Sequence, residues 1–289
     1  MNIDWPRGGM VTQRIANPFI PVRFWTWPPN IIDFINHKEY FNCLFRYNNL
    51  FNTIYIRMKK IRNHDKLYLK SNLYNKPKES FKLLYEILRK KISKNKNYEI
   101  LDVGCANGEL LYFLNNKFNN IKLHGIDVRS DLLKLAKKKL PSDINLKKVD
   151  FNKKQNFNKK FDIIIVSGVI GIFDKLDIFF QNIKKNLKKN SIFLLFGSFN
   201  EYDVDVILAY KDLNSKIKNY QSGWNFWSLK TITRHFKGKK IVKYPFEIKF
   251  DIKQNKKDLI RTWTVKINNK RYFINALLTI QNQMWLEIK

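Results

Sequence analysis

Three runs in the central part of the chain contain an aspartate, and two of these aspartates recur at corresponding places. Asp102 lies within the apolar run EILDV, whereas Asp127 ends KLHGID and Asp150 closes the run NLKKVD in the same way. Because the carboxyl ends of parallel strands meet at one edge of a sheet, we expect Asp127 and Asp150 to lie there. A carboxylate at the end of the second strand can accept hydrogen bonds from both hydroxyls of a ribose. The spacing therefore indicates a site for a nucleotide-like ligand.

A glycine-containing turn, residues 102–108 (DVGCANG), joins the first of these runs to a predicted helix. Gly104, Cys105, Ala106 and Gly108 have small side chains that let a ligand approach the backbone, and the helix N-terminus offers N–H donors. The dinucleotide fingerprint GxGxxG is not met by the four-residue interval between the two glycines. NAD is therefore the weaker alternative for the ligand.

The elements that must position this site alternate between strand and helix from Tyr98 onward, which is typical of a parallel sheet covered on both faces. Strands are predicted at 99–103, 122–127, 145–150, 161–167, 191–196, 239–252 and 277–288. Helices are predicted from 109, at 130–140 with Ser130 as the cap, after Asp174 as the cap, and at 203–220 and 228–236. A hairpin is predicted over 262–274, because paired Asn residues tolerate the positive φ of its turn.

Residues 1–30 contain five Pro and three Trp, a composition that opposes helix and indicates an extended arm. Helices are predicted next at 41–62 and 77–93. We therefore expect an N-terminal arm and helical extension over residues 1–95 and a separate domain over 96–289. The aromatic side chains of the arm either pack on that domain or anchor the chain to a partner or a membrane surface.

Four segments, in order, resemble the successive motifs of the class I S-adenosylmethionine-dependent methyltransferases. They are LDVGCANGELL, GIDVRSDLLKLAKKKL, VDF and FDIIIVSGVIGIFDKLDIFFQNIKKNLKKNSIFLLF. The resemblance implies an α/β, Rossmann-like fold with a seven-stranded, mostly parallel sheet and an antiparallel last strand. It also implies a helical N-terminal extension, a small β-hairpin insertion within a lid at 221–275, and S-adenosylmethionine as the cofactor.

The same resemblance assigns the parts of the cofactor to the chain. The methionine part would lie on the turn after the first strand, and the ribose on Asp127. The adenine ring would lie between Val128 and Phe151, with its amino group donating to Asp150. The implied cofactor-binding residues are Asp102, Gly104, Cys105, Ala106, Gly108, Asp127, Val128, Asp150, Phe151, Ser167 and Gly168.

The C-terminal part of the chain indicates the acceptor, the molecule that would receive the methyl group. Glu201, which lies beyond the end of a predicted strand, is a candidate general base that would remove the acceptor's proton. The stretch from 222 onward, which begins SGWNFWSLKTI, resembles methyltransferases of bacterial polysaccharide and small-molecule biosynthesis. Trp224 and Trp227 would then belong to a lid that stacks on a sugar or another flat acceptor, or else fill the space between lid and sheet. We expect O-methylation of a glycan or another small molecule.

The net charge leaves other functions open. The chain has 55 Lys and Arg against 24 Asp and Glu, a formal charge of +31, and 44 of the basic residues are Lys, which carries an unoriented point charge. This excess either reflects codon bias or attracts a polyanion. One alternative is therefore an RNA methyltransferase that uses a basic surface. Another is a methyltransferase-like binding or scaffold protein without turnover.

Several other classes of protein are disfavoured. The start, residues 1–21, interleaves charged residues and Pro instead of forming a secretory signal, and the apolar stretch 161–173 is shorter than a membrane span. Cys43 and Cys105 are 62 positions apart, with no metal-ligand spacing around them. We expect a cytoplasmic protein with two reduced thiols and no metal site.

Overall fold

The computed structural model describes residues 68–154, 159–217, 219–256, 258 and 260–289. The chain divides into two units, Met1–Met58 and Lys59–Lys289, and every described residue belongs to the second. The predicted arm over 1–30 and the predicted helix over 41–62, with Cys43, lie outside the described residues. Among the described residues, no helix combines the length and the apolar character needed to cross a membrane.

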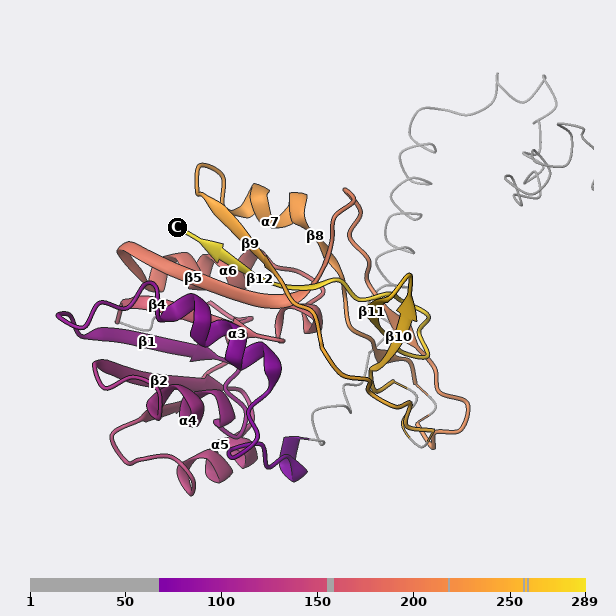
Figure 1. The fold of residues 1–289 in the computed structure, drawn as a ribbon, viewed down its shortest axis with the longest axis horizontal. Coiled ribbons are helices and arrows are strands. Elements are labelled where there is room, and N and C mark those ends of the chain that lie inside the picture. The colour runs from indigo at the N-terminus through magenta and orange to yellow at the C-terminus, as the bar shows by residue number, and fades with distance from the viewer. Residues whose placement is uncertain (1–67, 155–158, 218, 257, 259) are drawn as a thin grey trace, which may run out of the picture. The chain divides into compact units, whose positions relative to one another are not determined.

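A mostly parallel sheet forms the centre of the described unit (Figure 1). Its strands are β1 Tyr98–Val103, β2 Ile121–Asp127, β3 Asn145–Lys148, β4 Phe161–Ser167, β5 Leu187–Asn200, β8 Trp227–Ser228, β9 Ile241–Pro245 and β12 Gln283–Ile288. Seven of them follow the order β3-β2-β1-β4-β5-β12-β9, and β8 adds a short pairing to the end of β5. Because β12 runs antiparallel to both β5 and β9, the predicted fold with an antiparallel last strand is confirmed.

Helices cover both faces of this sheet, and strand alternation divides the core in two. Ile100 packs in one cluster with side chains of α3 Glu79–Leu88, α4 Glu109–Asn115 and α5 Ser130–Lys137. Its neighbour Leu101 packs in the other, with α6 Asp177–Asn186 and α7 Leu229–His235. The helix predicted at 77–93 is thus α3, and it belongs to the same core as the sheet.

The register of the central strands determines which residues meet at their carboxyl ends. Asp102 of β1 lies opposite Gly125 of β2 and Ile165 of β4. Asp127 and Ser167 are the last residues of β2 and β4. The three strands therefore present their carboxyl ends, and the turn that follows β1, at one edge of the sheet.

Two segments outside the main sheet, residues 201–226 and 246–282, form what we call the extension. It contains the short strands β6 Ala209–Tyr210 and β7 Gln221–Ser222 and the hairpin of β10 Trp263–Ile267 with β11 Lys270–Ile274. The two segments pack together, since a Cβ placed on Gly223 would lie 2.7 Å from Leu208 and 3.2 Å from Leu277. The hairpin prediction is confirmed, and its turn residues Asn268 and Asn269 have φ of 49° and 62°.

The helix predicted at 203–220 is wrong. Polar side chains there bind the backbone N–H two residues further on: Asp212 accepts from Asn214 at 2.9 Å, and Ser215 from Ile217 at 3.1 Å. Such local bonds favour turns over helix. This is why β6 and β7 are joined by turns.

Two predicted helix caps and two strand boundaries also differ. Arg129 occupies the cap position of α5 and Leu176 that of α6, and neither side chain makes a capping hydrogen bond. Asp174 instead accepts a hydrogen bond from Asn225 at 2.9 Å. β9 ends at Pro245 and β12 begins at Gln283, because the chain between them leaves the main sheet to build the extension. The lid predicted over 221–275 therefore does not correspond to one unit, because this range also contains α7 and β9, which belong to the main sheet and the helices that cover it.

Candidate functional site

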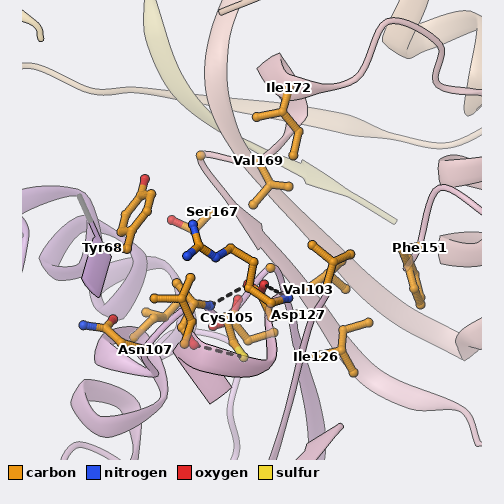
Figure 2. Close-up of a pocket in the computed structure, with 18 of the residues that line it drawn as sticks. Tyr68, Val103, Cys105, Asn107, Ile126, Asp127, Phe151, Ser167, Val169 and Ile172 are labelled. Carbon is orange, nitrogen blue, oxygen red and sulfur yellow. Dashed lines mark hydrogen bonds between the residues drawn. The ribbon is translucent and has the colours of Figure 1, made fainter. Parts of the chain in front are cut away.

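A pocket opens at the carboxyl ends of β1, β2 and β4 (Figure 2). It holds about 1000 Å³ of space between atoms, counting its open mouth. Ten of the eleven predicted cofactor residues line it: Asp102, Gly104, Cys105, Ala106, Asp127, Val128, Asp150, Phe151, Ser167 and Gly168. The eleventh, Gly108, is the residue from which α4 begins, and it is not among the lining residues.

Both glycines of the turn are required by its conformation. Gly104 has φ +78°, and a Cβ there would lie 2.5 Å from a methyl carbon of Val169. Gly108 has φ +85°, and a Cβ there would lie 2.7 Å from a methyl carbon of Leu140. Positive φ and close neighbours both exclude larger residues. Ala106 also has positive φ, 48°.

The N–H groups of the turn are used within the protein. Those of Gly104 and Cys105 donate to the carbonyl of Ile126, at 2.8 and 3.0 Å. The N–H of Gly108 donates to the carbonyl of Cys105 at 2.8 Å. These three N–H groups therefore shape the turn. The expectation that the helix N-terminus offers N–H donors to a ligand concerns the start of α4 and stays a prediction.

The carboxylate of Asp127 is fixed in orientation by two backbone donors. Its Oδ2 accepts from the N–H of Ala106 and its Oδ1 from the N–H of Arg129, both at 2.9 Å. A carboxylate has about four acceptor positions, so these two bonds orient the group while ribose hydroxyls can also donate to it. Figure 2 shows Asp127 beside the turn that holds Cys105.

Asp102 is enclosed at the floor of the pocket, with 2% of its surface exposed. Burial, with a further contribution from the charge of Asp127, raises its pKa to about 7, although the positive charge of Lys78 opposes the shift. A carboxyl group in this state gains from a cationic ligand, which would stabilise its ionised form. Burial likewise raises the pKa of Cys105, so its thiol stays protonated and fills space beneath the turn.

Lys78 lines the pocket, although no sequence pattern distinguishes it from the lysines around it. Burial lowers the pKa of its amine, and the charges of Glu109 and Asp102 counteract part of that shift. The ammonium also lies 5.4 Å from the ring centre of Tyr68 and 5.3 Å from that of Phe81. A cation and a buried carboxyl thus face the same space.

Glu109, the first residue of α4, explains how Tyr68 and Lys78 reach the pocket. Its Oε1 accepts hydrogen bonds from the hydroxyl of Ser71 at 2.7 Å and the N–H of Leu73 at 2.8 Å. The hydroxyl of Tyr74 donates to the carbonyl of Asn107 at 2.6 Å, and burial raises its pKa to about 12. From the sequence, Glu109 is only an acidic residue in a first helical turn, where such residues are common.

The side of the pocket predicted to hold adenine is formed by residues of unequal exposure. Val128 is 50% exposed, whereas Phe151 is buried and packs edge-to-face on Phe179 with 6.2 Å between ring centres. Asp150 accepts a hydrogen bond from the N–H of Asn152 at 3.0 Å. In Figure 2, Phe151 and Tyr68 lie at opposite ends of the pocket.

The edge that follows β4 is held by the extension. Ser167, Gly168, Val169, Ile172 and Phe173 line the pocket. Asn225, which is 3% exposed, donates from its side chain to the carbonyl of Phe173 at 2.7 Å, and its N–H donates to the carbonyl of Gly171 at 2.8 Å. Its Oδ1 accepts from the N–H of Leu208 at 2.9 Å. The sequence drew attention to the tryptophans of this loop rather than to the asparagine between them.

The residues predicted to act on the acceptor do not line the pocket. The side chain of Glu201 is 57% exposed and accepts a hydrogen bond from Asn282 at 3.1 Å. Trp227 is a core residue whose Nε1 donates to the carbonyl of Ile170 at 3.2 Å. Trp224 is partly exposed and lies next to Gly171. Trp227 therefore fills space between extension and sheet, as in the second of the two alternatives above.

Within the part of the chain that the structure describes, no three His, Cys, Asp or Glu side chains are grouped as metal ligands. The titratable side chains around the pocket are instead carboxylates, one lysine, one arginine, one tyrosine and one thiol. They form a site for a polar organic ligand.

Residues 94–250, more than half of the chain, match the family model described as "Methyltransferase domain". That range includes β1 to β5, α4 to α7 and all eleven predicted cofactor residues.

Two curated relatives are similar to the chain over part of its length. The malonyl-[acyl-carrier protein] O-methyltransferase of Priestia megaterium is 28% identical over 145 residues, 48% of this chain and 52% of the relative. The carboxy-S-adenosyl-L-methionine synthase of Campylobacter hominis is 31% identical over 123 residues, 41% of this chain and 51% of the relative. The chain thus spans about half the length of these two relatives.

Among solved structures, the glycopeptide N-methyltransferase MtfA aligns with a TM-score of 0.47 at 12% identity, over 73% of this chain and 90% of that one.

Proposed function

This chain belongs to the methyltransferase-domain family, and from that premise we propose that it transfers a methyl group from S-adenosylmethionine to an oxygen of a small molecule or glycan. The observation that carries the proposal is one pocket in which Asp102, Asp127 and Lys78 converge at the strand ends of the matched domain. The glycine turn supplies the close backbone approach that such a ligand needs.

The residues present fit the charges of this cofactor. Its amino-acid part carries an ammonium and a carboxylate, and its sulfur is positively charged. Asp102, whose pKa of about 7 marks a buried carboxyl group, suits the ammonium. Lys78 suits the carboxylate, and the oriented carboxylate of Asp127 suits the two ribose hydroxyls.

When bound, the cofactor supplies a methyl group on sulfur that is already activated for displacement. The chain's own task is to hold the two reactants in line, because alignment accounts for a large part of the rate in such transfers. Val169, Ile172 and Phe173 place apolar side chains at the edge after β4, where they exclude water. Ser167, at the end of β4, is the polar group at that edge.

A small acceptor is supported by the distribution of lysines. Among the lysines that the structure describes, Lys78 alone lines the pocket, and the other cation there, Arg129, is paired with Asp131. A nucleic-acid acceptor would favour several basic side chains around the pocket mouth. The lining instead combines apolar side chains with a few polar groups, as small-molecule sites do.

The first experiment is calorimetric titration of the protein with S-adenosylmethionine, S-adenosylhomocysteine and NAD. We expect micromolar binding of both sulfur compounds and no binding of NAD. The variant Asp127→Ala should lose at least about tenfold in affinity, because ribose recognition contributes more than one charge-assisted hydrogen bond. Asp143→Ala, which removes an exposed carboxylate between α5 and β3, is the matched control and should bind like the wild type.

The acceptor is then tested with methyl-labelled cofactor and three pools: low-molecular-weight metabolites, oligosaccharides and RNA. Label in either of the first two pools, dependent on Asp127, supports the proposal. Label in RNA alone would replace the proposed acceptor. Folded protein that binds neither sulfur compound would leave only a non-catalytic role for the domain.

A further inference from the structure

Large apolar side chains that face solvent are concentrated in the extension. Nine of the twelve such side chains among the described residues lie within residues 202–280, and the two most exposed are Leu213 at 85% and Leu278 at 81%. Six of these nine side chains are Leu213, Tyr220, Phe250, Ile267, Leu278 and Ile280. A concentration of exposed apolar side chains in one part of a protein is a feature of interaction surfaces.

Leu278 is held outward by a strained backbone. Its φ is +56°, a region that costs a branched side chain about 1 kcal/mol. Two bonds from the buried Asn275 maintain the conformation: the N–H of Leu277 donates to its Oδ1 at 3.0 Å, and the N–H of Leu278 to its carbonyl at 2.9 Å. The loop is therefore built to present a leucine to the surroundings.

Leu213 is presented by a turn that is also fixed by hydrogen bonds. It follows Asp212, whose Oδ1 accepts from the N–H of Asn214, and a serine turn at Ser215 comes directly after. The segment joins β6 to β7, and the extension's other segment packs on this ladder at Gly223 and Leu277. Figure 1 shows the hairpin of β10 and β11 beyond one end of the main sheet, away from α4 and α5.

Basic residues accompany these apolar tips. The extension, residues 201–226 and 246–282, contains eleven Lys and Arg and seven Asp and Glu, and the whole chain carries +31. A second copy of the chain would bring the same positive charge against this surface. A nucleic acid would pair with the basic side chains but would not bury two protruding leucine side chains. An anionic lipid surface satisfies both, since it combines negative headgroups with an apolar interior.

We propose that the extension is a membrane-contact surface, in which Leu213 and Leu278 enter the outer part of an anionic bilayer and the surrounding lysines contact its headgroups. The inference does not depend on methyl transfer. It assigns the extension a second role. The first is to hold the rim of the candidate cofactor pocket through the hydrogen bond from Asn225 to Phe173.

The experiment is vesicle flotation of the full chain with equal parts of phosphatidylglycerol and phosphatidylcholine, and with phosphatidylcholine alone. We expect binding to the first and not to the second, weakening as salt is raised. Leu213→Asn and Leu278→Asn remove the apolar tips, and Asn tolerates the positive φ at 278. Each should lower vesicle affinity by about tenfold, the loss expected for one buried leucine side chain.

Ile178→Gln removes an exposed apolar side chain from α6, outside the extension, and is the matched control. It should bind vesicles like the wild type, and all variants should retain the wild-type affinity for S-adenosylhomocysteine. Wild-type protein that does not float with the anionic vesicles overturns the proposal. The proposal is also overturned if both leucine variants float with these vesicles as well as the wild type does. A loss of self-association or of RNA binding in the leucine variants, without a loss of vesicle binding, would overturn it too.

Discussion

Asn225 in the extension donates a 2.7 Å hydrogen bond to the carbonyl oxygen of Phe173 on the rim of the candidate cofactor pocket. The same amide also reaches the carboxylate of Asp174 and accepts from the N–H of Leu208. One buried side chain thus joins the loop after β4 to Leu208, which lies 35 residues after Phe173 in the sequence. Buried polar networks that are fully satisfied fix a single arrangement of the elements they join.

Asn225→Ala should destabilise the protein by about 1–3 kcal/mol, because it leaves the partly buried carbonyl of Phe173 and N–H of Leu208 without their partner. The measurement is urea unfolding. Asn219→Ala, an exposed asparagine in the same extension, should change stability by less than about 0.5 kcal/mol. Equal effects of the two substitutions would show that the loop after β4 does not need this bond.

Binding of S-adenosylhomocysteine should strengthen as pH rises from 6 to 8. Asp102 has a pKa of about 7 in the free protein, and its ionised form is the one that attracts the ligand's ammonium. The affinity should therefore fall by up to about tenfold per pH unit below 7. Calorimetric titration at pH 7 in buffers with different enthalpies of ionisation should give different binding enthalpies, because protons are released from Asp102 on binding. Asp102→Asn should bind weakly at every pH, without the slope.

Asp102 should also make the protein less stable at high pH. A carboxyl group has a pKa near 3.9 in the unfolded chain, so ionisation is harder in the folded state, and stability falls as pH rises from about 4 through 7. Asp102→Asn removes this penalty. Its melting temperature should match that of the wild type near pH 4 and exceed it at pH 8. An equal decline in both proteins would mean that another group is responsible.

Lys78→Met should lower the affinity for S-adenosylhomocysteine at least about tenfold, because it removes the ion pair proposed between the Lys78 ammonium and the ligand's carboxylate. The loss of one ion pair in a partly buried site has about this magnitude. The same variant should bind 5′-methylthioadenosine, which lacks the amino-acid part, as the wild type does. Lys76→Met, at a neighbouring exposed lysine, should leave both affinities unchanged. A parallel loss for both ligands would assign Lys78 to packing instead.

Gly104→Ala should impair both folding and cofactor binding, because the new Cβ would lie 2.5 Å from Val169, which lines the pocket. Gly238 has a similar φ of +81° with no atom within 4 Å of an added Cβ. Gly238→Ala therefore isolates the backbone penalty, about 1 kcal/mol. The comparison by urea unfolding and calorimetry should show the larger stability loss, and a loss of affinity, only at 104.

The sequence predicted the main sheet well because its signals are local. Ile163 to Val166 form a continuous apolar run, as a strand covered on both faces requires, and the glycines at 104 and 108 identify a turn with positive φ. The helix expected at 203–220 failed because side-chain hydrogen bonds at Asp212 and Ser215 favoured turns over the helical ladder.

By itself, then, the sequence determined the fold class and most of the residues that line the candidate cofactor pocket, since turn glycines and strand-end carboxylates follow from neighbouring residues. Only the tertiary structure decided what completes the site. Lys78 and Tyr68 come from before the first strand, Asn225 comes from the extension, and Glu201 and Trp227 are turned to other partners. Contacts between distant segments depend on how the layers pack, and no local pattern of residue types records that packing.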